Sequence, residues 1–321
     1  MRPTAVRDGT VTTGAGRACP MIRRLLEAGP GLLVQGITGR QGQLETRWML
    51  DSGVKVAAGV TPGKGGSEVH GVPVFDTVAA AVAATGAQVA MSYAPSQAAA
   101  DAVAEAAQAG LELIVVSSEN IPRHRWLRAL DVARAHNCRV IGPNSQGVVV
   151  PGVGRIGCPG GNEPWQRFAA GSVGIVSRSG GMASELAMLV RTWGWGTSVQ
   201  MSIGGMPTAG TTLTEGVELV AGDPLTRAVL VFGEPSSSQE VVLARAVADG
   251  RIELPIIAMV AGRAGDSLPT ALPFGHAPRD ADGATVQEKC AALADVGVLV
   301  ARSTHDIRAH LAEALPAAAF R

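Results

Sequence analysis

The sequence predicts an α/β protein with two doubly wound parallel sheets, one after the other along the chain. Three observations support this prediction. From residue 31 onward, short apolar runs alternate with helical stretches, which is typical of parallel sheets covered on both faces. A segment rich in glycine and proline interrupts the alternation near residues 151–171, after which it resumes. At 321 residues, the chain is also longer than one hydrophobic core usually organises.

The first half of the sequence is predicted to form one domain, at residues 29–150. Its apolar runs have the length of buried strands, and helical stretches separate them, one of which is alanine-rich. The expected strands are residues 31–36, 54–60, 88–93, 111–118 and 138–144, and the expected helices are residues 43–53, 77–84, 97–109 and 123–136.

The second half predicts another domain, at residues 172–321, joined to the first by a connection at residues 151–171. The same alternation of apolar runs and helical stretches indicates a second parallel sheet. The expected strands are residues 172–177, 197–203, 227–234 and 255–262, and the expected helices are residues 183–193, 211–222 and 238–250.

The first 28 residues predict a disordered extension. They contain five arginines and only two acidic residues, without a clear apolar period. This composition is also typical of targeting peptides. We interpret it instead as a frayed or incorrectly assigned N-terminus, for which Met21 offers an alternative start.

Composition excludes several classes of function. Basic and acidic residues both total 27, so the chain has no charge excess of the kind that nucleic-acid binding requires. Its longest apolar stretches are far shorter than the roughly 20 residues of a membrane helix. The four cysteines are scattered, without the spacing of a metal site or the density of a disulfide scaffold, which fits a reducing compartment. We expect a cytoplasmic protein without a metal site, nucleic acid or membrane.

A glycine loop follows the first expected strand and runs directly into a helix. Gly36, Gly39 and Gly42 are spaced G-x-x-G-x-x-G. Glycines let the backbone approach a phosphate closely, and the amide groups of the following helix attract the anion. The loop therefore predicts a phosphate-bearing ligand, with tight turns that bind nothing as the alternative.

The second expected strand argues against a dinucleotide. The first loop lacks the G-x-G-x-x-G spacing, and no acidic residue ends the second strand to hold a ribose. Lys64 lies instead in a glycine loop at this point, which favours a ligand with an extra phosphate. An NAD-dependent oxidoreductase is therefore the less favoured interpretation.

A second glycine loop lies at residues 177–181, again between a strand and a helix. The amide groups of Ser179, Gly180 and Gly181 could hold a second anion where the helix starts. The G-x-S-x-G pattern of a hydrolase is not met. A purely structural turn is the alternative.

Seven segments together resemble one known family in order and spacing. The resemblance is to the α subunit of succinyl-CoA synthetase and its relatives, malate–CoA ligase, citryl-CoA synthetase and the homologous part of ATP citrate lyase. It extends from about residue 31 to the C-terminus. The segments are QGITGRQGQ, AAGVTPGKGGSEVHGVPVF, IGPNSQGVVVPG, GIVSRSGGMASE, SIGGMP, VFGEP and FGHA.

This resemblance implies a CoA-binding Rossmann domain followed by a flavodoxin-like ligase domain that carries a phosphorylated histidine. His276 matches that histidine, and Glu234 matches the glutamate that orients its imidazole. The residues that match the CoA site are Thr38, Gly39, Arg40, Gln41, Gly42, Lys64, Ser117, Ser118 and Glu119. Those that match the phosphoryl and substrate site are Asn144, Ser145, Gln146, Ser177, Ser179, Gly180, Gly181 and Ser184.

The implied reaction makes an acyl-CoA thioester from a carboxylic acid, CoA and a nucleoside triphosphate, through an acyl phosphate and phospho-His276. The chain contains no ATP-grasp segment. ATP or GTP with Mg²⁺ is therefore expected on a separate ATP-grasp β subunit, in a heterodimer or heterotetramer.

The sequence departs from the family pattern near the expected phosphohistidine. Pro278, Arg279 and Asp280 replace small residues after GHA, Met206 replaces an aspartate, and GEIGG appears as GEPSS. A CoA-binding pseudoenzyme or regulatory paralogue without ligase activity is therefore the alternative.

Two further departures concern the acid. Ser184 stands where the succinate enzymes have a tyrosine, and Ser145 and Gln146 replace a cysteine and a proline. Loss of an aromatic ring and gain of hydroxyl and amide groups predict a larger and more polar pocket. We expect an acid other than succinate, such as a branched, hydroxylated or tricarboxylic one.

Overall fold

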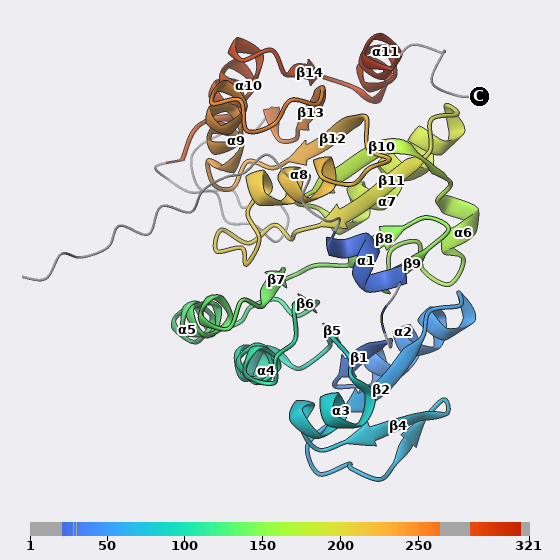
Figure 1. Ribbon diagram of the computed structural model, residues 1–321. Coiled ribbons are helices and arrows are strands. Elements are labelled where there is room, and N and C mark those ends of the chain that lie inside the picture. The colour runs from blue at the N-terminus through green and yellow to red at the C-terminus, as the bar shows by residue number, and fades with distance from the viewer. Residues whose placement is uncertain (1–20, 28, 30, 264–282, 316–321) are drawn as a thin grey trace, which may run out of the picture.

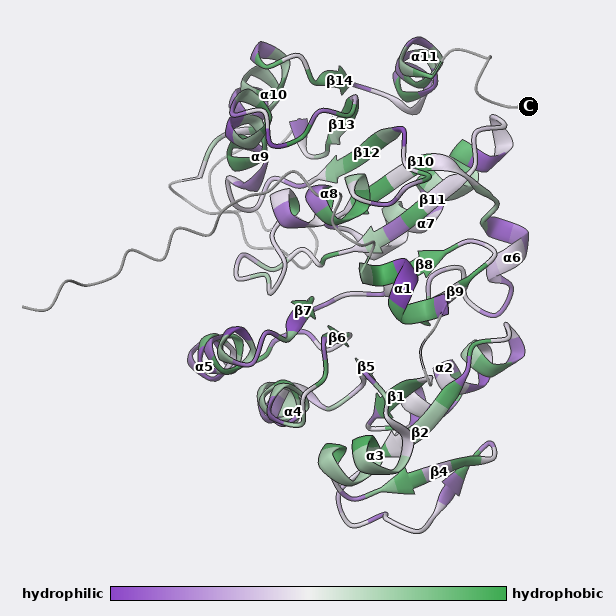
Figure 2. Cartoon of the chain, in the orientation of Figure 1, coloured by the Kyte–Doolittle hydropathy of each residue, from purple (hydrophilic) through white to green (hydrophobic). Residues whose placement is uncertain are grey.

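Two seven-stranded sheets, each covered by helices, make up the fold (Figure 1). A computed structural model describes residues 21–27, 29, 31–263 and 283–315. Hydrophobic residues concentrate on the strands, whereas the covering helices carry hydrophilic residues among hydrophobic ones (Figure 2). This distribution is expected where strands are buried and each helix has one exposed face.

The first sheet has the strand order β3-β4-β2-β1-β5-β6-β7, in which only β3 is antiparallel to its neighbour. The other six strands are parallel and follow the order of a Rossmann fold, as expected. Its strands are β1 (Leu32–Gln35), β2 (Val56–Val60), β3 (Glu68–Val69), β4 (Val72–Phe75), β5 (Val89–Ser92), β6 (Leu113–Val116) and β7 (Arg139–Ile141).

Four helices accompany the first sheet. One apolar cluster joins α3, α4 and α5 to one face, and the other face packs against α2. The helices are α2 (Arg40–Asp51), α3 (Val78–Thr85), α4 (Ser96–Gln108) and α5 (Arg123–Ala135). Because β1 is followed by a connection to β2 on one side and β5 lies on its other side, the strand order reverses between β1 and β5.

The second sheet has the order β14-β13-β12-β10-β11-β8-β9. Strands β10 to β14 are parallel in a flavodoxin-like order, which confirms the predicted fold class. Its strands are β8 (Gly147–Val150), β9 (Gly154–Gly157), β10 (Ala170–Ser177), β11 (Thr197–Ser202), β12 (Ala228–Gly233), β13 (Ile256–Val260) and β14 (Leu299–Ala301).

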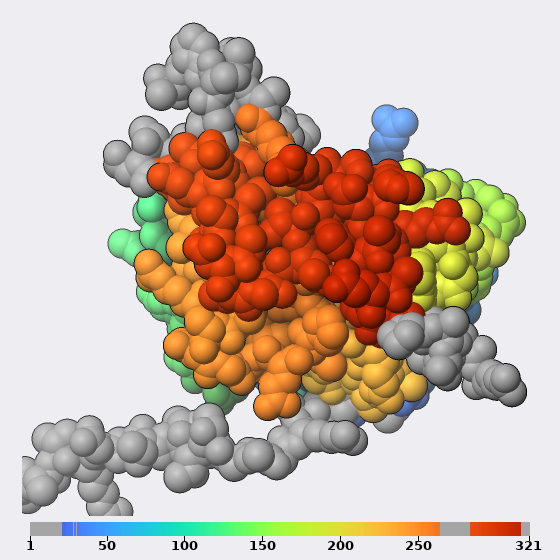
Figure 3. Space-filling view, turned by 90° about the horizontal axis from the view of Figure 1, so that it is seen from above, coloured from blue at the N-terminus to red at the C-terminus, as the bar shows by residue number. Residues whose placement is uncertain are grey.

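Helices cover both faces of the second sheet. Helices α7 and α11 share one apolar cluster with it, and α8, α9 and α10 share another. Viewed from above, α10, β14 and α11 form much of the surface (Figure 3). The helices are α6 (Pro164–Arg167), α7 (Gly180–Thr192), α8 (Leu213–Ala221), α9 (Gln239–Ala248), α10 (Val286–Asp295) and α11 (Thr304–Ala314). Within the described residues, no helix is long and apolar enough to span a membrane.

The structure differs from the expectation that residues 151–171 form only a connection between the domains. Residues 147–157 form the β8–β9 hairpin, and β8 pairs antiparallel with β11, so the second sheet begins before the expected boundary at residue 150. Val148, Val150 and Ile156 are fully buried in an apolar cluster that also contains residues of β1 and β5. The hairpin therefore packs between the two domains, and its apolar side chains belong to a cluster that both domains share.

The expected disorder of residues 1–28 is also wrong in part. Residues Met21–Glu27 form helix α1, and residues 1–20 lie outside the described part of the chain. Ile22 and Leu25 are buried in the shared cluster, and Arg23 Nε donates to Asp223 Oδ2 at 2.7 Å. These two apolar contacts and the ion pair explain why this arginine-rich segment is ordered.

Arg155 fastens the hairpin to the first domain. Its side chain is fully buried and donates to the backbone oxygens of Trp48 in α2 at 2.5 Å and of Pro159 at 2.9 Å and Gly161 at 2.5 Å. Burial lowers the pKa of this guanidinium. The guanidinium nevertheless lies buried between the domains, where it donates hydrogen bonds to three carbonyl groups.

Replacement of Arg155 tests whether this buried cation stabilises the packing of the hairpin against the first domain. We expect Arg155→Met to lower the free energy of unfolding by about 3 kcal/mol, because three carbonyl groups lose their donor. Arg47→Met is the matched control, since Arg47 is 60% exposed in its ion pair with Asp51, and its cost should stay below about 1 kcal/mol. Urea denaturation measures both changes. Equal losses in the two variants would contradict the structural role of Arg155.

Candidate functional site at the carboxyl edges of the two sheets

The first glycine loop lies at the carboxyl end of β1, where the strand order reverses. Gly36 has φ = +73°, and a Cβ atom on Gly42 would lie 2.3 Å from the Gly36 carbonyl oxygen. Gly39 is the N-cap of α2 and provides no side-chain cap. The amide groups at the start of α2 therefore face a loop with the shape and polarity to receive an anion.

The loop after β2 lies beside the first glycine loop. Thr38 Oγ1 donates to Thr61 Oγ1 at 3.3 Å, and the Lys64 N–H donates to the Thr61 carbonyl at 3.1 Å. The side chains of Arg40 and Lys64 are exposed. Two cations thus flank a loop that can accept an anion, and both remain accessible to a ligand.

The end of β6 completes this edge of the first sheet. Gln41 Nε2 donates to Ser117 Oγ at 3.3 Å and to Glu45 Oε1 at 2.9 Å. Ser118 Oγ donates to the Ala94 carbonyl, and the Glu119 carbonyl accepts a bond from Ser96 Oγ at 2.6 Å. All nine residues matched to a CoA site therefore gather at the carboxyl ends of β1, β2 and β6.

Residues 144–146 connect this edge to the second sheet. The Asn144 N–H donates to the Ser118 carbonyl at 2.9 Å, and the Ser145 N–H donates to the Val116 carbonyl at 3.1 Å. The Ser145 hydroxyl donates to the Ser202 carbonyl, at the carboxyl end of β11. A Cβ atom on Gly180 would lie 2.5 Å from the Gln146 Cγ. The segment thus runs from the first site edge directly to the second glycine loop.

The second glycine loop lies at the carboxyl end of β10 and starts α7. The Ser179 N–H donates to Ser177 Oγ at 3.1 Å, and Ser179 Oγ accepts from the Met182 N–H at 3.4 Å. Both serine hydroxyls are thereby committed to the turn. Gly181 is exposed, and a Cβ atom there would have nothing within 4 Å. The backbone at Gly181 therefore faces open space.

A cavity of about 390 Å³ lies between α2, the residues that flank the β8–β9 hairpin, α6 and α7. It brings together three residues matched to the substrate site with several that sequence reasoning did not select. The matched residues are Gln146, Gly181 and Ser184, and the others are Trp48, Cys158, Gly160, Gly161, Arg167, Glu185 and Met188. The sequence did not predict that these residues lie together. The hairpin that brings Gln146 close to residues 158–161 resembles a linker in sequence.

A buried polar cluster underlies this cavity. Burial raises the pKa of the Cys158 thiol to about 12, with a further contribution from Glu45. Cys138 lies apart from this cluster, beside a different cavity, and burial raises the pKa of its thiol to about 11. The pKa of the Tyr93 hydroxyl is also raised well above its usual value, first by burial and then by Glu45. Both thiols are therefore protonated at neutral pH and are unsuited to act as nucleophiles.

The residues matched to the phosphohistidine reaction are only partly described. Glu234 is 9% exposed and directly follows β12, which neighbours β10. His276, Pro278, Arg279 and Asp280 lie outside the described residues. Three buried charged residues near Glu234 escaped selection in the sequence, namely Arg178, Glu240 and Lys289.

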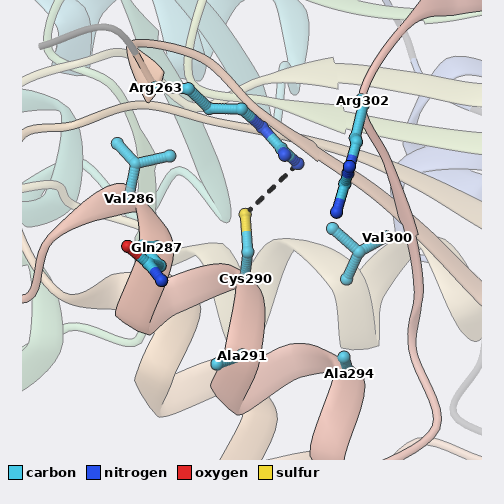
Figure 4. A pocket seen from close by; sticks show the side chains of 8 residues that line it. All are labelled: Arg263, Val286, Gln287, Cys290, Ala291, Ala294, Val300 and Arg302. Atoms are coloured by element: carbon cyan, nitrogen blue, oxygen red, sulfur yellow. Dashed lines mark hydrogen bonds between the residues drawn. The ribbon is translucent and has the colours of Figure 1, made fainter. Parts of the chain in front are cut away.

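A larger cavity of about 910 Å³ lies beside α10, and none of the described residues that line it was selected from the sequence. The side chains of Arg263 and Arg302 both extend toward the space beside Cys290 (Figure 4). Arg263 Nη2 lies 3.6 Å from the Cys290 sulfur. The cavity adjoins Arg263, the last described residue before the segment that contains His276.

Comparisons with known proteins agree with this geometry. Residues 31–120 match the family described as CoA binding domain, and residues 176–311 match the family described as CoA-ligase. The chain is 38% identical over 285 residues to the succinate–CoA ligase [ADP-forming] subunit alpha 1 of Archaeoglobus fulgidus, covering 88% of this chain and 95% of that protein. It is 35% identical to the malate–CoA ligase subunit alpha of Methylorubrum extorquens, covering 92% and 99% respectively.

A solved structure supports the fold. The ATP citrate lyase of Methanosaeta concilii, a D541A mutant in complex with (3S)-citryl-CoA, superposes with a TM-score of 0.80 at 24% identity. The match covers 88% of this chain and 49% of that one, so the present chain spans about half the length of the lyase. With both domain matches in order and relatives covered almost completely, the chain belongs to the succinyl-CoA synthetase α-subunit family of acid–CoA ligases.

Proposed function

We propose that this chain is the α-type subunit of a nucleotide-dependent ligase that joins a carboxylic acid other than succinate to CoA. The observation that carries the proposal is the chain of contacts from Ser118 through residues 144–146 to Gly180. Hydrogen bonds join residues 144 and 145 to the ends of β6 and β11, and Gln146 packs against Gly180. This continuity supports a single site in which a loop that binds CoA and a loop that holds a phosphoryl group lie at opposite ends. An acid held between them could meet both the thiol and the phosphoryl group.

The residues of the first sheet fit CoA. The tight approach of Gly42 to Gly36 leaves no room for side chains, and the uncapped start of α2 suits a phosphate. CoA carries a phosphate beyond its pyrophosphate, and the exposed ammonium group of Lys64 supplies a partner for it.

The chemistry we propose follows from the residue types. A ring nitrogen of His276 attacks the γ-phosphorus of ATP or GTP and releases ADP or GDP. A carboxylate oxygen of the acid then takes the phosphoryl group, which forms an acyl phosphate and frees the imidazole. The thiolate of CoA attacks the acyl carbon and releases inorganic phosphate. The Glu234 carboxylate would orient the imidazole, and the amide groups near Gly181 would hold the phosphoryl oxygens.

The nucleotide and Mg²⁺ would bind to an ATP-grasp β subunit in a heterodimer or heterotetramer. The relatives from A. fulgidus and M. extorquens are themselves named as alpha subunits. Their names support a second subunit here, since this chain also carries the two domains of the α type.

The 390 Å³ cavity supports an acid that is more polar than succinate. Gln146 and Ser184 line it where the succinate enzymes have a proline and a tyrosine, and Arg167 adds a cation. A half-buried amide and hydroxyl favour substrates that can hydrogen-bond with them.

A CoA-binding pseudoenzyme is the second candidate function. The departures at Met206, Pro235 and Ser236 favour it, because they alter the loops beside Glu234. The two candidates share CoA binding and differ in phosphoryl transfer.

One prediction of the proposed function concerns CoA binding. We expect Lys64→Ala to weaken CoA binding about 10-fold or more, because a charged partner of the extra phosphate is lost. The variant should bind dephospho-CoA, which lacks that phosphate, as well as the wild type does. Lys55→Ala is the control, since Lys55 is exposed before β2, at its opposite end. Titration calorimetry measures the four affinities, and an equal loss for both ligands would refute this role of Lys64.

The second prediction separates the two candidate functions. The complex with the β subunit, given Mg²⁺ and γ-labelled ATP or GTP, should acquire an acid-labile phosphate. The label should be absent from His276→Ala, because the imidazole nitrogen that accepts it is gone. His70→Ala is the control, since His70 lies on the exposed loop beyond β3. A wild-type complex that binds CoA but takes no label from either nucleotide would support the pseudoenzyme.

The third prediction concerns the acid. We expect kcat/KM to be higher for malate, citrate or itaconate than for succinate. Ser184→Tyr introduces the residue of the succinate enzymes and should lower that preference at least about 10-fold, because the aromatic ring fills space in the pocket. Steady-state thioester formation measures the ratio. Succinate as the best substrate of the wild type would show that the pocket residues were misinterpreted.

A further inference from the structure

Three charged side chains lie buried beneath the loop that carries Glu234. Arg178 follows β10, Glu240 lies in the first turn of α9, and Lys289 lies in α10. Arg178 is 1% exposed, and the other two are fully buried. Together with the carboxylate of Glu234, which is 9% exposed, two cations and two carboxylates lie in this part of the protein.

Glu240 and Lys289 hold the backbone of Glu234 from both sides. Glu240 Oε1 accepts the Glu234 N–H at 3.1 Å. Lys289 Nζ donates to the Glu234 carbonyl at 2.7 Å and to the Pro235 carbonyl at 3.1 Å. The Lys289 ammonium also lies 3.2 Å from Glu240 Oε2. Both backbone polar groups of Glu234 are therefore fixed by charged side chains.

Arg178 extends this support to two neighbouring loops. Its Nη2 donates to the Gly205 carbonyl at 2.8 Å and to Ser236 Oγ at 2.9 Å, and its Nη1 donates to the Ser236 carbonyl. Its Nη1 also lies 3.8 Å from Glu240 Oε1. One guanidinium thus joins the loops that follow β10, β11 and β12.

The departures from the family pattern strengthen this support. Ser236, at a position where the family has glycine, provides a hydroxyl that accepts from Arg178 and donates to the Gly205 carbonyl at 3.3 Å. A Cβ atom on Gly262 would lie 2.3 Å from Pro235 Cγ, so the proline ring packs closely against the end of β13. Ser237 adopts φ = +75°, which a side chain rarely tolerates without such constraint. The loop is therefore more firmly held than a glycine-rich one.

Stability alone does not account for these buried charges. Apolar side chains of similar size often stabilise an interior at least as well as a buried ion pair does. A buried ionic group that donates to backbone carbonyls fixes their positions in a way that an apolar group cannot.

We propose that Arg178, Glu240 and Lys289 are positioning residues that hold Glu234 at a fixed place relative to the loop at residues 177–181. The inference rests on the proposed function, since it assigns their effect to phosphoryl transfer through Glu234. It also implies that Pro235 and Ser236 support the reaction rather than disable it.

A double-mutant cycle tests the proposal in the complex with the β subunit. Lys289→Met should slow the labelling of His276 about 10-fold to 100-fold, because Glu234 is displaced. Glu234→Gln should also slow it. The double variant should be no slower than Glu234→Gln, within about twofold, since Lys289 then has no carboxylate to position. KM for the nucleotide and the Kd for CoA should stay within about twofold of wild type in all three.

Ser236→Gly keeps the proposal testable if Lys289→Met does not fold, because it removes only one hydroxymethyl group. It should slow labelling about threefold to 10-fold, and this effect should vanish in the Glu234→Gln background. Equal slowing in both backgrounds would overturn the positioning role while leaving the ligase proposal intact. A wild-type complex without any label would instead overturn the ligase proposal, and this inference with it.

Discussion

The buried guanidinium of Arg178 is the constraint on which the second half of the site depends. A guanidinium is planar and carries its donors in a fixed fork, so the groups it joins must lie in defined directions. Here these groups come from the loops after β11 and β12, while Arg178 itself follows β10. Because the three strands are neighbours in the order β12-β10-β11, one side chain can reach all three loops. The topology of the sheet thus makes this arrangement possible, and the arginine makes it rigid.

The two sheets contribute different kinds of loop to one site. At the first sheet, exposed cations and an uncapped helix leave groups available for a ligand. At the second sheet, Ser177, Ser179 and Arg178 are already occupied by contacts within the protein. The first edge is consequently suited to binding, and the second to holding a few reacting groups in place. Residues 144–146 join these two roles.

The elements β4, β14, α10 and α11 were not among the expected ones. Local sequence was sufficient to predict the other parallel strands, the helices that cover them and the glycine loops. These features depend on short apolar runs and on backbone conformations that glycine allows, both of which are visible within a few residues. The hairpin at residues 147–157 was missed because its glycines and prolines resemble those of a linker, and only its pairing with β11 shows its role. Lys289 and Glu240 were missed for a related reason. Both lie in helices where charged residues usually face solvent, and only the packing of α9 against α10 places them inside.

The shared apolar cluster gives the β8–β9 hairpin a consequence for how such chains can recombine. Its residues pair with the second sheet but are buried against strands of the first. A division after residue 150 would expose this apolar surface on one piece and separate β8 from its partner β9. Exchange of the CoA-binding half between relatives therefore requires a compatible hairpin from the other half. The two domains are distinct in topology, yet they share one apolar cluster.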